Sequence, residues 1–380
     1  MNTVHHLAAG REPDAPLLDA LREAHAAGAR VLLVVDGEGG AAGPAVHAIA
    51  QVLAGAGLTA KVRAEVRVET TAGGTEALPL HGLAERRLLH ELGPGEGAGI
   101  DVLPGGAGRA PDGSASSLGE GGGLLTACLV ASALGARDVH HWTTGTTLRA
   151  ADPDIVPEAP ALTALHVREA AELSFYGGPL PPMRAMQPAA AADIPIVLHT
   201  RGAETRIDHA VAPGAFPVRA VAAVRNLALV RLEGTGLSRS PDMQARLFAA
   251  LAAAEADTLL ISQGSAERSV TFAVRQDQVA AVEAGLKAAF RIDLSHGDVE
   301  DLHVRQDVAV VAAVGLGMAA SPGVAGRAFT ALGEAGANVL AIAQGSSEVN
   351  ISLAASHDHA DRAVRALCAA FGLDGHGGRP

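Results

Sequence analysis

The first half of the chain alternates between two spacings of its apolar residues. Segments 17–27 and 80–92 repeat apolar residues at helical spacing, whereas 31–35 and 100–103 are short apolar runs typical of strands. Strands that alternate with helices of this length predict crossover connections and a largely parallel sheet covered on both faces. We therefore expect an α/β sandwich domain over residues 1–210. Its other expected helices are 44–53, 124–134 and 167–173, and its other expected strands are 60–68, 139–142 and 194–198.

From residue 217 onward the pattern becomes that of a repeated unit. Landmarks recur at a constant offset of 81 positions, as in Pro241 and Pro322 or Phe248 and Phe329. Constant spacing indicates a duplicated structural unit, because chance similarity drifts in register. Each copy predicts the order β-α-β-β-α, a small α+β unit with an antiparallel sheet. The expected elements are 227–232, 241–254, 258–262, 269–274 and 278–289 in the first copy, and 308–314, 322–335, 338–343, 349–354 and 359–371 in the second.

The helix of each copy has a predicted start. Pro241 and Pro322 fit the first turn of a helix, where the missing N–H costs nothing. Ser240 and Ser321 then precede them as expected N-caps. The two copies are therefore expected to begin their first helices alike.

Composition narrows the class of partner. The net charge is -12, with no cluster of Lys or Arg, which argues against a nucleic-acid partner. The longest apolar run, 308–320, is broken by glycines and is too short to span a bilayer. Residues 1–11 lack the pattern of a secretory signal. Cys128 and Cys368 lie far apart in apolar surroundings and are expected to be buried thiols of a reducing compartment. We expect a cytoplasmic protein that binds small molecules, with no membrane and no nucleic acid.

Glycine-rich loops stand out in the first half. The run 119–123 precedes an expected helix, and its backbone N–H groups would suit a phosphate. The alternative is that a chain with 45 glycines produces such loops by chance, and this run carries Glu120 but no Lys or Arg. No Walker-type or dinucleotide-binding fingerprint is present.

The repeat resembles the paired ACT domains of aspartokinases. Segments 315–318, 321–325 and 342–348, Gly-Leu-Gly-Met, Ser-Pro-Gly-Val-Ala and Ile-Ala-Gln-Gly-Ser-Ser-Glu, are similar to the threonine-responsive branch. The resemblance covers about 216–373 and implies tandem ACT domains over 216–380, a homodimer formed through them, and a threonine-like amino-acid effector. It places that effector near five residues: Gln263, Gln344, Gly236, Gly317 and Ser346.

Physical chemistry supports this role for the two glutamines. An amide both donates and accepts, so it can bind the ammonium or carboxylate group of an amino acid, and glycine loops allow close approach. The alternative is that Gln263 and Gln344 pair with edge backbone at a dimer interface. Arg246, Arg327, Glu267 and Glu348 also recur, and surface ion pairs account for them.

The first half is similar to the amino-acid kinase domain of the same family, in an eroded form. Segments 117–119, 142–143 and 172–174 match it, but the charged residues of the family's site do not. Where the family has Arg-Gly-Gly-Ser-Asp, this chain has Glu-Gly-Gly-Gly-Leu at 120–124. The family's first-strand lysine falls at His6, and a later lysine falls at Pro179. The resemblance identifies no catalytic residues with certainty. Three residues are weak survivors of the family's kinase site: Thr143, Asp152 and Arg184.

The resemblance implies one leading function and two alternatives. Because phosphoryl transfer depends on neutralising phosphate charge, loss of several such residues is expected to leave little catalysis. The leading hypothesis is an amino-acid-sensing regulatory or pseudokinase subunit, a partner of a catalytic aspartokinase or homoserine dehydrogenase. The alternatives are an active aspartate kinase with a rearranged site and an ACT oligomerisation module. No cofactor or metal is certain, and ATP with Mg²⁺ is expected only if the kinase site functions.

Overall fold

A computed structural model describes residues 2–36, 42–93, 98–212, 216–234, 240–263, 269–345 and 349–375. The chain divides into two compact units. The first comprises 1–148, 161–174 and 179–212, and the second comprises 149–160, 175–178 and 213–380. Each unit is described by itself.

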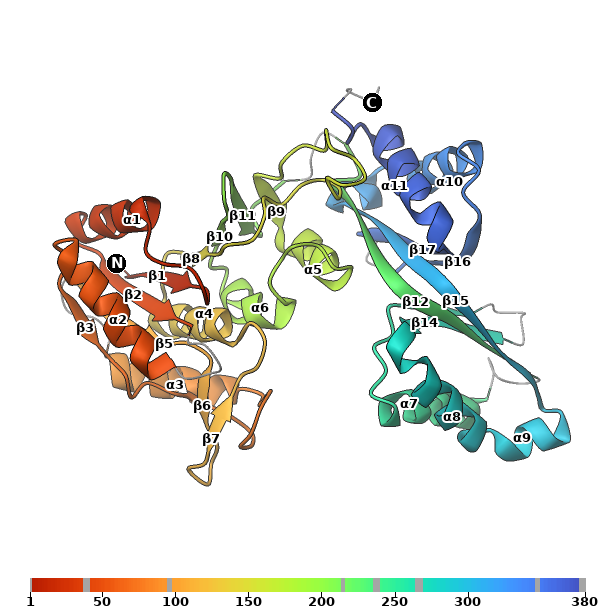
Figure 1. Cartoon of the computed structure of the whole chain (residues 1–380), viewed down its shortest axis with the longest axis horizontal. Coiled ribbons are helices and arrows are strands. Elements are labelled where there is room, and N and C mark those ends of the chain that lie inside the picture. The colour runs from red at the N-terminus through yellow and green to blue at the C-terminus, as the bar shows by residue number, and fades with distance from the viewer. Residues whose placement is uncertain are drawn as a thin grey trace. The chain divides into compact units, whose positions relative to one another are not determined.

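The first unit is built on an eight-stranded sheet (Figure 1). Its strands run parallel from β3 to β10, and β11 then pairs antiparallel with β10. This confirms the expected largely parallel sheet. The sheet order is β3 (Ala60–Val62), β5 (Gly99–Pro104), β2 (Arg30–Val35), β1 (Asn2–Leu7), β8 (Val139–Trp142), β10 (Ile196–His199), β11 (Glu204–Asp208) and β9 (Ala164–His166).

Helices cover both faces of this sheet. On one face α1 (Ala15–Ala26) and α2 (Ala42–Gly55) bury Leu17, Leu21, Val46 and Leu53 against β1 and β2. On the other, α4 (Gly122–Leu134) packs on β1 and β2 between α3 (His81–Leu92) and α6 (Met183–Ala191). The unit also contains α5 (Val167–Phe175) and a small sheet of β4 (Val68–Glu69), β6 (Ala107–Arg109) and β7 (Ala115–Ser117).

Two local predictions for this unit are corrected. The strand expected over 60–68 ends at Val62, and the chain enters the small sheet only at Val68. β1 and α6 were not predicted. β1 carries buried His5 and His6, which break the apolar pattern of a strand, and α6 contains Pro188, which sequence reasoning treats as a helix breaker.

The second unit contains one six-stranded antiparallel sheet in the order β13-β14-β12-β15-β17-β16. Figure 1 shows β12 and β15 as its two longest strands, with α7 and α8 beside one end of the pair and α10 and α11 beside the other. The elements are β12 (Ala220–Gly234), α7 (Pro241–Ala253), β13 (Leu260–Gln263), β14 (Ser269–Arg275), η2 (Gln276–Gln278), α8 (Val279–Ala289), α9 (Arg291–His296), β15 (Val299–Val314), η3 (Leu316–Ala320), α10 (Val324–Glu334), β16 (Val339–Ala343), β17 (Asn350–Ser356) and α11 (His357–Phe371).

The two repeats share their central strands. Residues 227–233 of β12 pair with β14 in the first repeat, whereas 220–224 pair only with the half of β15 that serves the second repeat. The register of β12 against β15 shifts around Asn226, which has φ 57°, and Asp307 has φ 55°. These residues are 81 positions apart, so both copies bend at the same place, with residue types that tolerate left-handed backbone.

The helix starts of the two repeats differ. Ser240 caps α7, since its hydroxyl accepts a hydrogen bond from Met243 N at 3.4 Å, with Pro241 at the first helical position. The matching prediction for Ser321 and Pro322 is wrong. α10 begins only at Val324, because Gly323 takes φ 87° after the turn of η3.

The structure confirms that both cysteines are buried. Cys128 and Cys368 are free and buried, and burial raises the pKa of each thiol to about 12. Both thiols are therefore protonated at neutral pH and act as apolar packing groups.

Candidate functional site

A polar cluster lies where β1, β2 and β5 end and α4 begins. The Asp36 carboxylate lies 3.2 Å from His6 Nε2. A Cβ added at Gly123 would overlap Asp36 Oδ1 and lie 2.6 Å from His6 Nε2, and one added at Gly105 would lie 2.9 Å from Asp36 Oδ1. Glycine at these two positions therefore allows Asp36 and His6 to lie directly against the first turn of α4.

The position of Asp36 matters because a helix N-terminus attracts anions. Unpaired N–H groups and the helix dipole make it a site for phosphate or carboxylate. Here the Asp36 carboxylate lies beside the first turn of α4, next to Gly123. Asp36 is three-quarters buried, so the carboxylate is also partly shielded from water.

The loop that leads into α4 is held by glycines and one arginine. Gly119 and Gly121 have φ of 69° and 71°, a left-handed conformation that favours glycine. Arg184 Nη2, at the start of α6, donates a hydrogen bond to the carbonyl oxygen of Glu120 at 2.7 Å. Arg184 therefore anchors this loop through its backbone.

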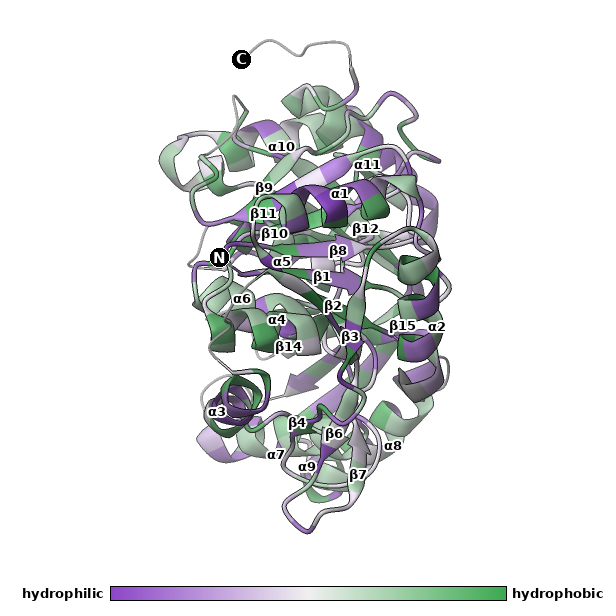
Figure 2. Cartoon of the chain, turned by 90° about the vertical axis from the view of Figure 1, so that its left-hand side faces the viewer, coloured by the Kyte–Doolittle hydropathy of each residue, from purple (hydrophilic) through white to green (hydrophobic). Residues whose placement is uncertain are grey.

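Five histidines line the adjacent strands β1, β8 and β10, and we call them the histidine ladder. The register places His5 opposite His140 and His6 opposite His141. His6 Nδ1 lies 2.7 Å from His141 Nδ1, and His140 Nδ1 lies 2.8 Å from His199 Nε2. Figure 2 shows hydrophilic, purple segments on β1 and β8. The ladder consists of His5, His6, His140, His141 and His199.

Burial keeps much of the ladder neutral. It lowers the pKa of His5 and of His141 well below the usual value, and the neighbouring imidazoles His140 and His6 lower them further. For His199, burial followed by the neighbouring His140 and Arg11 lowers the pKa to about 3. Neutral imidazoles contribute no positive charge for binding phosphate.

The three weak survivors of the kinase site do not form one constellation. The Thr143 hydroxyl accepts a hydrogen bond from Gly145 N at 3.1 Å, and its carbonyl accepts one from Arg11. Within the described part of the chain, no hydrogen bond or ion pair joins Thr143 to Arg184. Asp152 belongs to the second unit, where Oδ1 accepts a hydrogen bond from Asp154 N at 3.0 Å.

In the second unit, the two predicted effector glutamines occupy equivalent places. Gln263 ends β13 and Gln344 directly follows β16, and both side chains are exposed. β13 and β16 are the edge strands of the sheet, and they lie close to each other. Ile261 and Ile342, two residues before each glutamine, are 40% and 44% exposed. Gly236 and Ser346 lie outside the described residues.

Gly317 has a packing role in this structure. A Cβ added there would lie 3.0 Å from Pro217 Cα, and one added at Gly315 would lie 2.8 Å from Val218 Cα. Both glycines thus allow the segment before β12 to run directly against the start of η3. Gly317 remains a predicted effector residue, with this packing role beside it.

The recurring arginines stack on aromatic rings in both repeats. Arg246 lies 4.9 Å above the Phe290 ring and pairs with Asp293 at 2.7 Å. Arg327 lies 5.5 Å above the Phe371 ring. The contact between Arg246 and Asp293 is the surface ion pair expected for Arg246. Glu267 and Glu348 lie outside the described residues.

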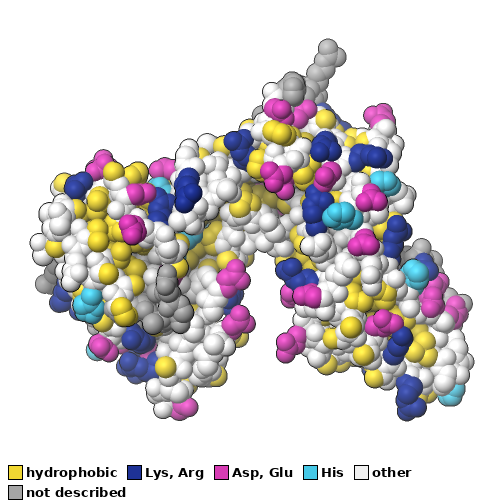
Figure 3. Space-filling model, in the orientation of Figure 1, with side chains coloured by type: hydrophobic (Ala, Val, Ile, Leu, Met, Phe, Trp, Pro, Cys, Tyr) yellow, Lys and Arg dark blue, Asp and Glu magenta, His cyan; other side chains and the backbone are white. Residues whose placement is uncertain are grey.

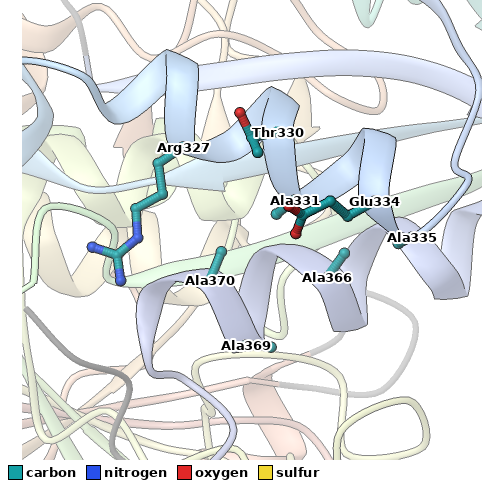
Figure 4. A pocket seen from close by; sticks show the side chains of 8 residues that line it. All are labelled: Arg327, Thr330, Ala331, Glu334, Ala335, Ala366, Ala369 and Ala370. Carbon is teal, nitrogen blue, oxygen red and sulfur yellow. The ribbon is translucent and has the colours of Figure 1, made fainter.

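A hollow of about 590 Å³ separates α10 from α11 (Figure 4). Alanines of both helices line it, with Arg327 toward one end and Glu334 toward the other. It contains none of the five predicted effector residues. The hollow is the space left where two alanine-rich helix faces meet.

Sequence reasoning missed the polar cluster at α4 and the histidine ladder. Two signals were available: the consecutive pairs His5-His6 and His140-His141 fall at equivalent places in two strands, and Asp36 directly follows the buried run of β2. Arg11, which lies 5.3 Å from the centre of the Trp142 ring, had no such signal.

The fold and these features define a class of protein: an amino-acid-kinase-like domain followed by tandem ACT domains. The Amino acid kinase family model matches residues 87–199, and the ACT domain model matches residues 230–290 and 311–371. An aspartokinase of Thermus thermophilus is 30% identical over 292 residues, which cover 72% of this chain and 68% of that protein. The chain belongs to the aspartokinase family.

Other comparisons agree on fold and extent. A bifunctional aspartokinase/homoserine dehydrogenase 1 of Zea mays, a chloroplastic protein, is 36% identical over 277 residues, which cover 69% of this chain but 30% of that protein. The chain thus spans about a third of the bifunctional relatives it matches. A structure of E. coli aspartokinase III in complex with lysine and aspartate has a TM-score of 0.69 at 21% identity, covering 97% of this chain and 99% of that one.

The surface fits the acidic composition. On the face shown in Figure 3, Lys and Arg side chains are scattered among Asp and Glu and form no continuous basic stripe. Among the residues that the structure describes, no helix is long and apolar enough to cross a membrane.

Proposed function

We propose that this chain is an amino-acid-sensing regulatory member of the aspartokinase family in which the kinase site is eroded. The domain boundaries of this proposal are 1–210 for the kinase-like domain and 216–380 for the ACT pair. Its working compartment is the cytoplasm. The effector is an amino acid of the aspartate-derived pathway, with threonine as the first candidate.

The observation that carries the proposal is the position of Asp36. A kinase of this architecture needs positive charge at the strand ends to neutralise phosphate. Here a carboxylate lies against the first turn of α4, held next to His6. A phosphate group at the same place would meet like charge at short range, and it would have to displace Asp36.

The distribution of lysine supports the same proposal. The sequence contains two lysines, Lys61 and Lys287. Lys61 is exposed on β3 and lines a hollow at the amino ends of β3 and β5, opposite the strand ends that hold Asp36. Lys287 lies on α8 in the second unit. No lysine is therefore available at the carboxyl ends of the first sheet.

The full chain is expected to form aspartyl phosphate at least about 10³-fold more slowly than a competent aspartokinase, because several charged contributors are missing. Hydroxamate trapping with aspartate, ATP and Mg²⁺ measures this rate, and ATP binding by titration calorimetry separates a site that binds nucleotide from one that does not. A rate within tenfold of the competent enzyme would instead support the alternative of an active kinase with a rearranged site.

The ACT pair supports the sensing half of the proposal. The exposed amides Gln263 and Gln344 lie at the ends of edge strands beside the exposed Ile261 and Ile342. Edge strands present unpaired backbone groups and invite pairing with another chain. This arrangement suits a homodimer in which ACT edges meet and an amino acid binds between them. The E. coli relative was crystallised with lysine and aspartate.

Titration calorimetry of the full chain with threonine, lysine, methionine and isoleucine tests sensing. One of these amino acids is expected to bind, and Gln344→Ala or Gln263→Ala is expected to weaken it at least about tenfold, the effect of losing a hydrogen bond to a charged group. Gln51→Ala, an exposed glutamine on α2, serves as the matched control and should leave binding unchanged. Absence of heat with all four amino acids would sink the sensing proposal.

The bifunctional relatives suggest the partner. The Zea mays relative is named as an aspartokinase and a homoserine dehydrogenase in one protein, so a catalytic aspartokinase or a homoserine dehydrogenase is the partner that the proposal names. Co-purification of the chain with these enzymes, with and without the effector, tests that assignment. If the chain dimerises but binds neither amino acid nor enzyme, the result would favour the alternative function, an ACT oligomerisation module.

A further inference from the structure

The first ACT repeat has an open sheet face, opposite α7 and α8. Ala228, Val230 and Phe272 point toward those helices and form the core, so the alternate residues of the same strands point the other way. A cavity of about 400 Å³ lies over this open face, with Leu340 of β16 contributing to its wall. Its lining residues are Leu229, Arg231, Ser269, Thr271, His303, Arg305 and Leu340.

Strand register brings three basic side chains together in this cavity. Arg231 of β12 is directly opposite His303 of β15, and Arg305 pairs one step along with Leu229. Direct cross-strand neighbours lie about 5 Å apart and diagonal ones about 7–8 Å apart at this spacing. Thr271 lies opposite Arg231 on its other side. Two guanidinium groups, an imidazole and a hydroxyl therefore converge.

The positive charge of this group is only partly balanced. Arg231 pairs with Glu233 on its own strand at 3.2 Å. His303 and Arg305 are exposed, and within the described residues neither has an acidic partner. Like charges on neighbouring strands destabilise a sheet, so a bound anion would stabilise this face. The clustering is notable because the chain as a whole carries a net charge of -12.

The second repeat provides an internal comparison. The residue pair that corresponds to Arg231 and His303 is Ala312 and Ala222, which also lie directly opposite each other. The position that corresponds to Arg305 is Val224, and Thr271 corresponds to Ser352. The basic side chains thus belong to one repeat alone. A fold requirement would apply to both copies, so these charges are not needed to form the sheet.

We propose that this cavity is a second ligand site, distinct from the loops of Gln263 and Gln344, which binds a small organic anion with two acidic oxygens or a phosphate group. Arg305 and Arg231 contact the anionic oxygens, and a guanidinium can bind a carboxylate or phosphate through two parallel hydrogen bonds. The Thr271 hydroxyl donates a further bond, while Leu229 and Leu340 contact the carbon skeleton. The ligand would connect β15 of the first repeat with β16 of the second.

Titration calorimetry of the full chain at low salt with succinate, glycerol 3-phosphate and inorganic phosphate tests the site. At least one probe is expected to bind with Kd of about 1 mM or tighter. Arg305→Gln is expected to weaken that probe at least about tenfold, the effect of losing a charge-assisted hydrogen bond. Binding of succinate but of neither phosphate would identify a dicarboxylate site. Binding of the phosphates but not of succinate would identify a phosphate site.

Arg275→Gln is the matched control. This exposed arginine on the same repeat pairs with Asp257 and lies outside the cavity, so its loss should leave binding unchanged. Thr271→Val, which keeps the side-chain shape, is expected to weaken binding about threefold, which is less than the loss of a charged donor. The proposal is overturned if no probe binds the unmodified chain, or if Arg305→Gln and Arg275→Gln weaken binding equally.

Discussion

Gly315→Ala is expected to destabilise the ACT pair by about 3 kcal/mol, because the new methyl group would overlap the backbone of residues 217–219. It would overlap the carbonyl oxygen of Pro217 and lie 2.8 Å from Val218 Cα and 2.9 Å from Arg219 N. Relief requires the start of β12 to move away, which strains the 2.7 Å hydrogen bond from Arg219 N to the carbonyl oxygen of Val314. Urea unfolding of the full chain measures the loss, and the melting temperature should fall by about 6–12 °C.

The repeat provides both a replicate and a control for this prediction. Gly234 is 81 positions earlier, and a Cβ there would lie 2.7 Å from Val299 Cα, so Gly234→Ala should behave like Gly315→Ala. Gly326 lies inside α10 with no atom within 4 Å of an added Cβ. Gly326→Ala should therefore stabilise the chain by up to about 1 kcal/mol. Equal stability of the Gly315 and Gly326 variants would contradict the packing argument.

The two ACT repeats are joined through their central strands. Each repeat has its own helices, but each completes its sheet with a strand that continues into the other repeat. A change in the register of β12 against β15 would therefore affect the parts of the sheet that belong to both repeats. If an amino acid binds at Gln344, the first repeat can respond through this shared pair of strands and through the contact between β16 and β13.

The sequence predicts the fold wherever the local pattern and the tertiary environment agree. The strand β2 and the helix α4 were both predicted, because each is mostly apolar and most of its residues are buried. The first half of β15 was missed, since Asp301, Arg305 and Asp307 make it look like a loop. Those residues face outward or line a cavity. They form a strand because this half of β15 pairs with the neighbouring strand β12, and not because of their own sequence pattern.

The candidate sites also fall into two groups: those that a local sequence pattern marks and those that only the fold brings together. The sequence singles out the duplicated glutamines because the repeat marks them. The structure describes both as exposed at the ends of edge strands, and their role in binding an effector stays a prediction. The cluster at α4 joins Asp36 with Gly105 and Gly123, which are 69 and 87 positions away. No local pattern links positions so far apart, because only the folded sheet brings the ends of β2, β5 and the start of α4 together. The absence of the family's charged residues can be seen in the sequence, but the position of Asp36 beside α4 cannot.

Acidification from pH 7.5 to pH 5.5 is expected to destabilise the first unit by about 4 kcal/mol. The pKa of His5 and of His141 lies well below the usual value of 6.5, and that of His199 is about 3. Below pH 6.5 the unfolded chain therefore binds protons at these three positions that the folded chain does not bind. Stability then falls with decreasing pH, by about 1.4 kcal/mol per pH unit for each histidine. The loss begins near pH 6.5 and grows as the pH falls toward the folded pKa values.

Urea unfolding at pH 7.5, 6.5 and 5.5 measures this dependence, and the window stays above the range in which ordinary carboxylates titrate. His199→Gln removes one of the three groups, so the slope below pH 6.5 should fall by about a third. His90→Gln, an exposed histidine on α3, is the matched control and should leave the slope unchanged. Stability that stays flat across the window would mean that the ladder takes up protons in the folded state. The histidines would then titrate near their usual pKa of 6.5, and they would add positive charge only below about that pH.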